Sequence, residues 1–217
     1  MSYTLVIGNK NYSSWSMRAW LLLKLAGVPF TEKSVLLYTE SSRRQVKELG
    51  GETGLVPVLI HGETAIWDMF AITEYLYEQF SQVWPVDPKD RARARSYFGE
   101  LHSGFNALRD AMPLNARGRK RLAKRTPEVI TDIERVFTIW SRAGRPNDGP
   151  WLFATFCAAD IMFAPVALRF QTYAVDVPNY ASAYYRMLLS HPLVVEWQEL
   201  GRIERTVIDR FELPEIA

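Results

Sequence analysis

Strand-like and helical segments alternate along the first eighty residues, and this order constrains the fold more than any other feature of the sequence. Apolar runs bounded by turn residues predict strands at 3–8, 30–36, 54–60 and 64–67. Helical patterns predict helices at 16–26, 40–49 and 69–80. The resulting order, β-α-β-α-β-β-α, predicts a small α/β domain at residues 1–80. The first of these helices is apolar on all sides, so we expect it to be buried in the core.

The rest of the chain carries only helical patterns. Residues 81–88 contain two prolines and no clear period, and we interpret them as a linker to an all-helical domain at residues 89–217. Between Lys89 and Met112, apolar residues recur at spacings of four and three, which predicts one continuous helix that ends at Pro113. Further helical segments are predicted from Pro127 and over 158–174, 179–190 and 192–211.

Composition argues against several classes of function. Apolar residues make up 48% and charged residues 23%, as in an ordinary globular protein, and the net charge of +2 gives no support for nucleic-acid binding. We interpret the basic run Arg117–Arg125 as a solvated loop. No apolar run approaches the ~20 residues that a membrane span needs. The three histidines show no metal-ligand spacing, so no metal is predicted. The single cysteine, Cys157, cannot form an internal disulfide, and we expect a cytoplasmic protein.

Pro57 stands at the start of the third predicted strand. Because proline cannot donate to a β-ladder, it belongs at a strand start or an edge. If the bond between Val56 and Pro57 is cis, the backbone N–H and C=O of Val56 would be open to pair with an extended, peptide-like ligand. An ordinary trans proline that begins a strand is the alternative.

Four short stretches lie in fixed order on this framework. They are Ser13-Ser-Trp-Ser-Met-Arg18, Leu55-Val-Pro-Val-Leu59, Asp68-Met-Phe-Ala-Ile-Thr-Glu-Tyr-Leu76 and Cys157-Ala-Ala-Asp160. Together with the order of elements they resemble the glutathione transferase superfamily over the whole chain, and the first stretch is similar to the Ser-x-x-Ser-x-Arg run of its zeta-like members. The resemblance implies a thioredoxin-like, glutathione-binding domain at 1–80, a helical substrate domain at 89–217, and a homodimer.

The serines of the first stretch are the candidates for catalysis. Glutathione's thiol should titrate near pH ~8.5, and lowering its pKa by about two units requires roughly 2.7 kcal/mol. A hydroxyl that donates to the thiolate could supply about 1.5–3 kcal/mol, and the positive end of a helix up to about 1 kcal/mol. The resemblance implies Ser13 as this donor by its distance from Arg18, while Ser14, Ser16 and Tyr12 are alternatives. Any of these serines could instead be a plain helix N-cap.

The resemblance also implies a glutathione-binding set. The backbone of Val56 next to Pro57 would pair with the tripeptide. The carboxylate of Asp68 would hold the ammonium of the γ-glutamyl group, and the backbone N–H of Met69, at a helix N-terminus, would bind its carboxylate. The family usually has serine where this chain has Met69, and the lost hydroxyl donor would weaken affinity by roughly tenfold.

The second substrate would lie against the helix predicted at 89–112. The expected pocket residues lie on or beside its apolar stripe, with Tyr12 added from the first loop. They are Tyr12, Tyr97, His102, Phe105 and Arg109. An aromatic and cationic wall of this kind suits a flat or anionic electrophile, although Phe105 could simply be a core residue.

Three functions follow from the resemblance. The first is a serine-type glutathione transferase that adds the glutathione thiolate to a small electrophile, with glutathione as co-substrate. The second is a glutathione-dependent isomerase of the maleylacetoacetate type. The third is a non-catalytic binding module of the same fold, which Met69 favours and the Ser13-Ser14 cluster opposes.

Overall fold

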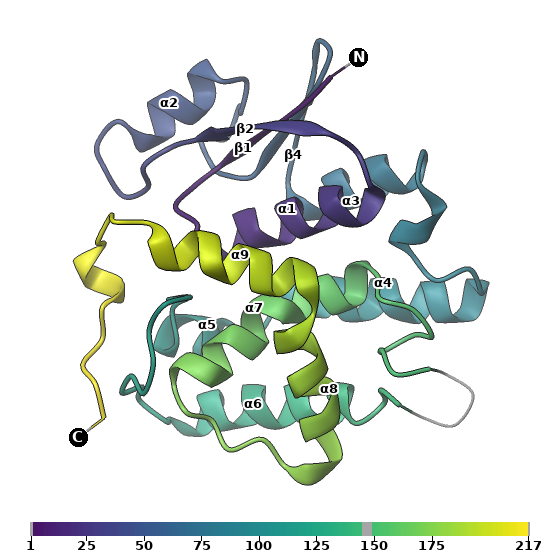
Figure 1. The fold of residues 1–217 in the computed structure, drawn as a ribbon, viewed down its shortest axis with the longest axis vertical. Coiled ribbons are helices and arrows are strands. Elements are labelled where there is room, and N and C mark those ends of the chain that lie inside the picture. The colour runs from purple at the N-terminus through teal and green to yellow at the C-terminus, as the bar shows by residue number, and fades with distance from the viewer. Residues whose placement is uncertain (1, 145–148, 217) are drawn as a thin grey trace.

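The computed structural model describes residues 2–144 and 149–216. In the first part of the chain, four strands alternate with three helices: β1 (Tyr3–Ile7), α1 (Ser14–Ala26), β2 (Phe30–Ser34), α2 (Ser42–Glu48), β3 (Val58–His61), β4 (Thr64–Trp67) and α3 (Met69–Tyr77). A short 3₁₀ turn at Ser81–Val83 leads into a helical part: α4 (Pro88–Ser103), α5 (Asn106–Ala111), α6 (Pro127–Trp140), α7 (Ala158–Thr172), α8 (Asn179–Ser190) and α9 (Pro192–Ile203). Figure 1 shows the sheet above and the helical part below. The predicted fold class, an α/β part followed by helices, is confirmed.

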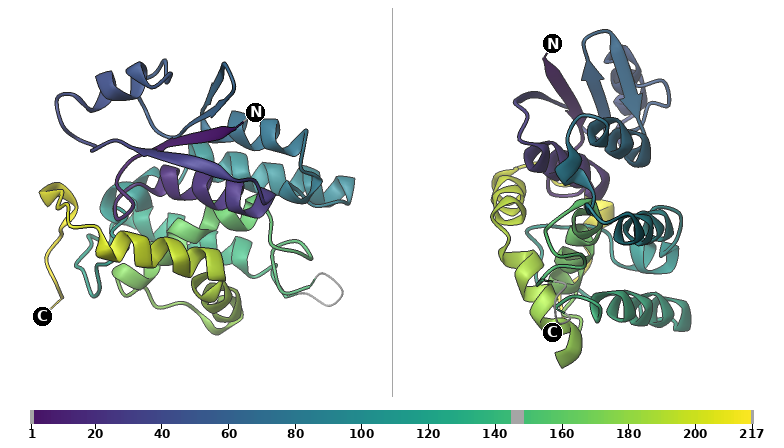
Figure 2. Two further views of the ribbon diagram at one scale, coloured as in Figure 1. Left: turned by 45° about the horizontal axis from the view of Figure 1, so that its top comes forward. Right: turned by 90° about the vertical axis from the view of Figure 1, so that its right-hand side faces the viewer.

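The sheet is mixed, with strand order β2-β1-β3-β4. β1 pairs in parallel with β2 and antiparallel with β3, so that Leu5 faces Leu59 and Val6 faces Val58. Because side chains alternate across a strand, Leu5 lies in the main core with α1 and α3, whereas Val6 and Val58 pack against Val46 of α2. The sheet therefore has helices on both faces, as Figures 1 and 2 show.

Helix α1 lies between the sheet and the helical part (Figure 1), and it contacts α3, α7 and α9. Its residues are buried on almost every side, as the sequence predicts. The helix ends at Gly27, which adopts a left-handed conformation with φ 73° and donates its N–H to the carbonyl oxygens of Leu23 and Lys24. The same burial fixes the position of the N-terminus of α1, where the candidate serines lie.

The prediction of one continuous helix over 89–112 is wrong, because the structure has two helices there. α4 ends at Gly104, and Phe105 then adopts a left-handed backbone with φ 57° before α5 begins. Asp132 of α6 accepts a hydrogen bond of 3.0 Å from the free N–H of Leu108 in the first turn of α5. The N–H group that the break leaves without a partner in its own helix is thus satisfied by a side chain of a distant helix. A local apolar pattern does not reveal such a partner.

The helical segment predicted over 192–211 is also shorter than expected. α9 ends at Ile203, and only a 3₁₀ turn at Asp209–Phe211 follows. Glu204 leaves the helical path and accepts hydrogen bonds from the side chain of Asn9, at 2.7 Å, and from the backbone N–H of Lys10, at 2.5 Å. The segment after α9 is therefore bound to the loop that precedes α1.

The described residues lack two features that would suggest other functions. No helix among them has the length and apolar character to cross a membrane. Within 2–144 and 149–216 there is also no group of three or more histidine, cysteine, aspartate or glutamate side chains that could hold a metal ion.

Candidate functional site

Two adjoining pockets open between the N-terminus of α1 and the loop before β3. The inner pocket has a volume of about 250 Å³ and is lined by Trp15, Thr53, Leu55, Val56, Pro57, Trp67, Asp68, Met69 and His102. The outer pocket has a volume of about 450 Å³ and is lined by Ser13, Trp15, Leu37, Tyr38, Thr39, Glu40, Ser42, Arg43, Gly54, Leu55 and Val56. The two pockets share Trp15, Leu55 and Val56, and together they have the size of a small-molecule site, ~300–1,000 Å³.

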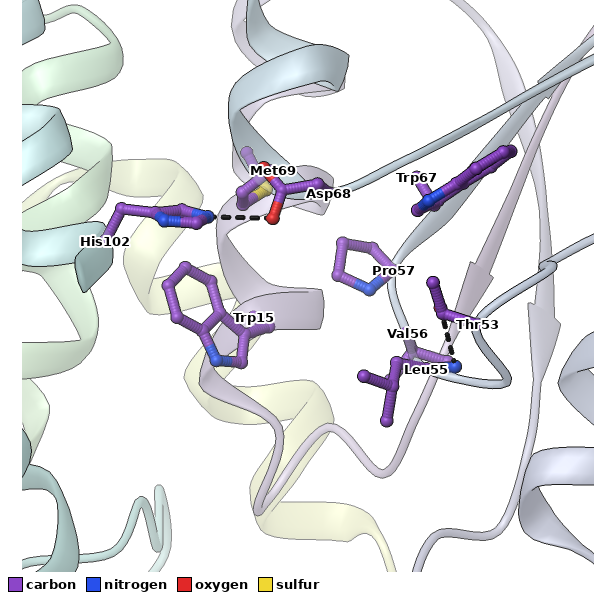
Figure 3. A pocket seen from close by; sticks show the side chains of 9 residues that line it. All are labelled: Trp15, Thr53, Leu55, Val56, Pro57, Trp67, Asp68, Met69 and His102. Atoms are coloured by element: carbon purple, nitrogen blue, oxygen red, sulfur yellow. Dashed lines mark hydrogen bonds and ion pairs between the residues drawn. The ribbon is translucent and has the colours of Figure 1, made fainter.

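The loop before β3 supplies the shared wall. The peptide bond between Val56 and Pro57 is cis. β3 begins at Val58, so the backbone of Val56 lies just outside the ladder formed with β1 and β4. Figure 3 shows Pro57 and Val56 facing the Trp15 side chain across the inner pocket.

Asp68 connects the sheet to α3 at the edge of the inner pocket. Its Oδ1 accepts a hydrogen bond of 2.8 Å from the N–H of Phe70 and so caps α3. Its backbone has φ 73° and ψ 136°, a conformation that costs a residue with a side chain about 1–3 kcal/mol. Strain of this kind persists where the surrounding structure demands it, which is common at ligand sites.

The second oxygen of Asp68 contacts the helical part. Asp68 Oδ2 lies 2.8 Å from Nε2 of His102 on α4, and both side chains are partly exposed. Figure 3 shows this contact beside the Trp15 ring, whose centroid lies 5.3 Å from that of His102. The inner pocket is thus built by both parts of the chain, with a carboxylate and an imidazole at its edge.

Met69 places its side chain and its backbone in different environments. The side chain is buried in the main core, only 2% exposed. Its backbone N–H lies in the first turn of α3, where helical N–H groups lack partners within the helix. This position can therefore offer a backbone donor to a ligand, together with the positive end of the helix dipole.

The early serines have different hydrogen-bond partners. Ser13 is the N-cap of α1: its Oγ accepts from the N–H of Ser16 at 3.2 Å and donates to Ser16 Oγ at 2.8 Å. Ser16 Oγ also accepts from the N–H of Gly8 at 2.9 Å, so this buried hydroxyl joins α1 to the residue that follows β1. Ser14 Oγ accepts from Nη2 of Arg169 at 3.3 Å, and the Ser14 carbonyl oxygen accepts from Arg18 at 3.4 Å. Of the three serines, Ser13 lines the outer pocket.

The structure separates the predicted second-substrate residues. His102 lines the inner pocket. Arg109 does not, but its guanidinium carbon lies 4.9 Å from the centroid of the Trp15 ring, which does. Tyr97 and Phe105 are buried in the core and line neither pocket. Tyr12 also lines neither, because its hydroxyl donates to Glu212 at 2.5 Å and accepts from Arg117 at 2.6 Å.

Several pocket residues were missed by sequence reasoning. They are Trp15, Thr53, Trp67 and Arg43. Trp15 had a signal, because it stands within the Ser13–Arg18 stretch, between two of the candidate serines. Trp67 is the last residue of β4 and Arg43 lies in α2. No local pattern indicates that these side chains reach the same place.

Comparison with known proteins identifies the fold. A family model, the glutathione S-transferase N-terminal domain, matches residues 12–79, which include the early serines, Pro57 and Asp68. The N-terminal part of the chain is therefore similar to the N-terminal domain of glutathione transferases. The matched segment ends just after α3. It therefore includes both the N-terminus of α1 and the loop before β3, which form the two pockets.

Other similar proteins match a larger share of the chain than that segment. Protein IN2-1 of Zea mays is 24% identical over 195 residues, which are 89% of this chain and 74% of that protein. A probable maleylacetoacetate isomerase of Caenorhabditis elegans is 32% identical over 110 residues, or 50% of this chain and 51% of that protein. A glutathione transferase homolog from Burkholderia GL BGR1, solved with bound glutathione, has a TM-score of 0.69 at 23% identity and covers 93% of this chain and 98% of that one. The glutathione transferase fold therefore extends over nearly the whole chain.

Proposed function

We propose that this protein is a glutathione transferase in which a serine hydroxyl at the N-terminus of α1 stabilises the thiolate of glutathione. The observation that carries this proposal is the adjacency of the two pockets. Ser13 lines the outer one, Asp68 and Met69 line the inner one, and Val56 lies in the wall of both. An extended tripeptide that lies across both pockets would contact all four residues.

The tripeptide would lie across both pockets. Its γ-glutamyl end would occupy the inner pocket, with its ammonium against Asp68 and its carboxylate on the N–H of Met69. Its cysteinyl backbone would pair with Val56, and its glycyl carboxylate would enter the outer pocket. Arg43 lines that pocket and makes no ion pair among the described residues, so it is the cation we assign to this carboxylate.

The reaction follows from this placement. The thiol of glutathione loses its proton to solvent, and the thiolate is held by the serine hydroxyl and the positive end of α1. Its sulfur then forms a bond to an electrophilic carbon. A leaving group departs with its electron pair, or, where the acceptor is an activated double bond, the resulting carbanion takes a proton.

Ser13 is the donor that we favour, with Ser14 as the alternative. Ser13 lines the pocket, and on ligand binding its hydroxyl would turn from Ser16 Oγ to the sulfur while Ser16 keeps its bond from Gly8. In Ser14, the oxygen accepts from Arg169, which leaves its own proton available for donation. Single alanine variants separate the two.

The test measures the pKa of bound glutathione from the ultraviolet absorbance of its thiolate, together with kcat/KM for an aryl halide. Ser13→Ala should raise this pKa by about one to two units and lower kcat/KM by about ten- to a hundredfold, because one hydrogen bond to a charged acceptor is lost. Ser96→Ala, an exposed serine on α4, is the control. If only Ser14→Ala has this effect, Ser14 is the donor, and if neither has it, the hydroxyl mechanism is wrong.

Calorimetric titration with glutathione separates the enzyme from a non-catalytic module. An enzyme should release heat when it binds glutathione and should convert the electrophile to product. A module that no longer binds glutathione should do neither. Light scattering of the purified protein tests the predicted homodimer, and cell fractionation tests the predicted cytoplasmic location.

A second candidate function is isomerisation of the maleylacetoacetate type, which the Caenorhabditis elegans relative favours. The thiolate would add to a double bond, the single bond so formed would rotate, and elimination would restore both the double bond and the thiolate. Glutathione is then not consumed. Turnover of maleylacetoacetate with substoichiometric glutathione would support this function, and consumption of one glutathione per product would exclude it.

A further inference from the structure

Three arginine side chains meet where α1 packs against the helical part. They are Arg18 of α1, Arg109 of α5 and Arg169 of α7, and we call them the arginine cluster. Arg18 and Arg169 are buried, only 1% and 4% exposed, whereas Arg109 is half-buried. Buried guanidinium groups are normally paired with carboxylates, because removing an unpaired charge from water is costly.

The arginine cluster has no carboxylate in ion-pair contact among the described residues. None of its members makes an ion pair with any residue in 2–144 or 149–216. Arg18 Nε donates to the carbonyl oxygen of Met162 at 3.0 Å, and Arg169 Nε donates to that of Met112 at 2.7 Å. Arg18 Nη2 and Arg169 Nη1 are buried and have no hydrogen-bond partner in the described chain. Each buried member thus keeps a free donor.

The three positive charges also repel one another. Burial, followed by the charges of Arg169 and Arg109, holds the pKa of Arg18 well below its usual range. Burial and the charge of Arg109 lower the pKa of Arg169 to about 10. Burial lowers the pKa of Arg109, and the neighbouring Asp110 opposes this only in part. A negative group among the three would relieve both the repulsion and the unpaired donors.

The arginine cluster lies directly behind the proposed glutathione site. The guanidinium carbons of Arg18 and Arg109 lie 4.6 and 4.9 Å from the centroid of the Trp15 ring, which lines both pockets. Arg169 Nη2 donates to Ser14 Oγ, next to the candidate donor Ser13. Arg109 is the most exposed member of the cluster.

We propose that the arginine cluster binds a carboxylate carried by the electrophilic substrate. Guanidinium groups bind carboxylates through paired N–H donors. Arg18 and Arg169 each have a buried nitrogen without a hydrogen-bond partner in the described chain. Glutathione's own carboxylates are assigned to Met69 and Arg43, which leaves the cluster on the helical side for the second substrate. This inference rests on the proposed function, and it selects anionic electrophiles over neutral ones of the same shape.

The first experiment compares two electrophiles that differ in one group, a chloronitrobenzoate and the matching chloronitrobenzamide. Wild type should show a kcat/KM for the acid at least about tenfold above that for the amide, as expected for a charge-assisted contact. Arg109→Gln should reduce this ratio towards one, and Arg109→Lys should keep part of it. Arg93→Gln, an exposed arginine on α4, should leave the ratio unchanged. Equal ratios in wild type and Arg109→Gln would overturn the proposal.

The second experiment needs no turnover and no glutathione. Calorimetry with benzoate and with benzamide measures whether the empty protein prefers the anion, and quenching of tryptophan fluorescence reports binding next to Trp15. Benzoate should bind wild type and Arg93→Gln at least about tenfold more tightly than it binds Arg109→Gln. If benzoate binds this way but no electrophile reacts, the proposed function is wrong while the anion site stands. If benzoate and benzamide bind alike, the anion site is wrong.

Discussion

Asp68 combines three tasks in one residue. It caps α3, it contacts His102 of the helical part, and its backbone adopts a positive φ of 73°. The first two tasks need a carboxylate or an amide, whereas the third favours glycine. Asp68 thus places a charged side chain at a backbone conformation of the kind that clusters at functional sites.

This conflict gives a prediction about Asp68 variants. Asp68→Gly relieves the strained backbone and caps α3 almost as well, so its free energy of unfolding should stay within about 1 kcal/mol of wild type. Asp68→Ala keeps the strain and loses the cap, and should be about 1–3 kcal/mol less stable than Asp68→Gly. Urea unfolding measures both differences.

Glutathione titration completes the prediction, because both variants lose the carboxylate and should bind more weakly by a similar factor. Asp68→Asn is the matched control: it can cap α3 and adopt a positive φ, so it should be stable and still bind weakly. Tight glutathione binding by Asp68→Asn would show that the charge of Asp68 does not hold the ligand.

At the scale of an element, the ends of the helices depend on different physics from their interiors. α1 ends at Gly27, which has φ 73°, and apart from its chain neighbours no described residue comes within 4 Å of the position that a Cβ would take. Gly99 lies inside α4 and also has open space around its Cβ position, but its backbone is helical. The two glycines therefore differ in backbone conformation and not in crowding.

Alanine substitutions at these glycines should have effects of opposite sign. Gly27→Ala should destabilise the protein by about 1 kcal/mol, because a Cβ disfavours the left-handed conformation. Gly99→Ala should stabilise it by up to about 1 kcal/mol, since alanine loses less entropy than glycine in a helix. Thermal and urea unfolding of the two variants measure the signs, and a loss of stability in both would contradict this explanation.

At the scale of the whole molecule, the segment after α9 connects regions that are far apart in sequence. Glu212 accepts from Tyr12 in the first loop, from Arg117 at 3.0 Å and from Arg121 at 3.2 Å. The basic run was predicted to be a solvated loop, but both arginines are bound to this segment and only about a fifth exposed, 23% and 21%. Glu212 therefore supports the loop that leads to the candidate serines.

Neutralising Glu212 should loosen this connection. Glu212→Gln should lower the free energy of unfolding by about 1.5–3 kcal/mol, because it removes charge-assisted hydrogen bonds and leaves the partly buried Arg117 without an ion pair. Glu215→Gln is the control: Glu215 is 70% exposed and lies 3.5 Å from Arg121, so its loss should cost less than about 1 kcal/mol. Similar urea midpoints for the two variants would show that Glu212 is not an anchor.

Much of the fold was predictable because its signals are local. The strands around Pro57, the buried character of α1 and the N-cap at Asp68 follow from apolar pattern, turn residues and capping chemistry, which act over a few residues. The break at Gly104–Phe105 was not predictable in this way, since the apolar period continues across it and Asp132 of another helix compensates it. The site divides similarly: Asp68 and Pro57 have local signatures, whereas Arg43 and Trp67 reach the pockets only through the fold.

The sequence by itself determined the order of elements, the two-part division of the chain and the resemblance to glutathione transferases, since short-range periodicity and motif spacing encode these. Only the tertiary structure decided that Tyr12 binds the C-terminal segment, that Asp68 meets His102, and that three arginines, two of them buried, come together without an ion pair to any described residue. The physical reason is that electrostatic and hydrogen-bond partners are set by proximity in space, and in each of these contacts the partners are distant along the chain.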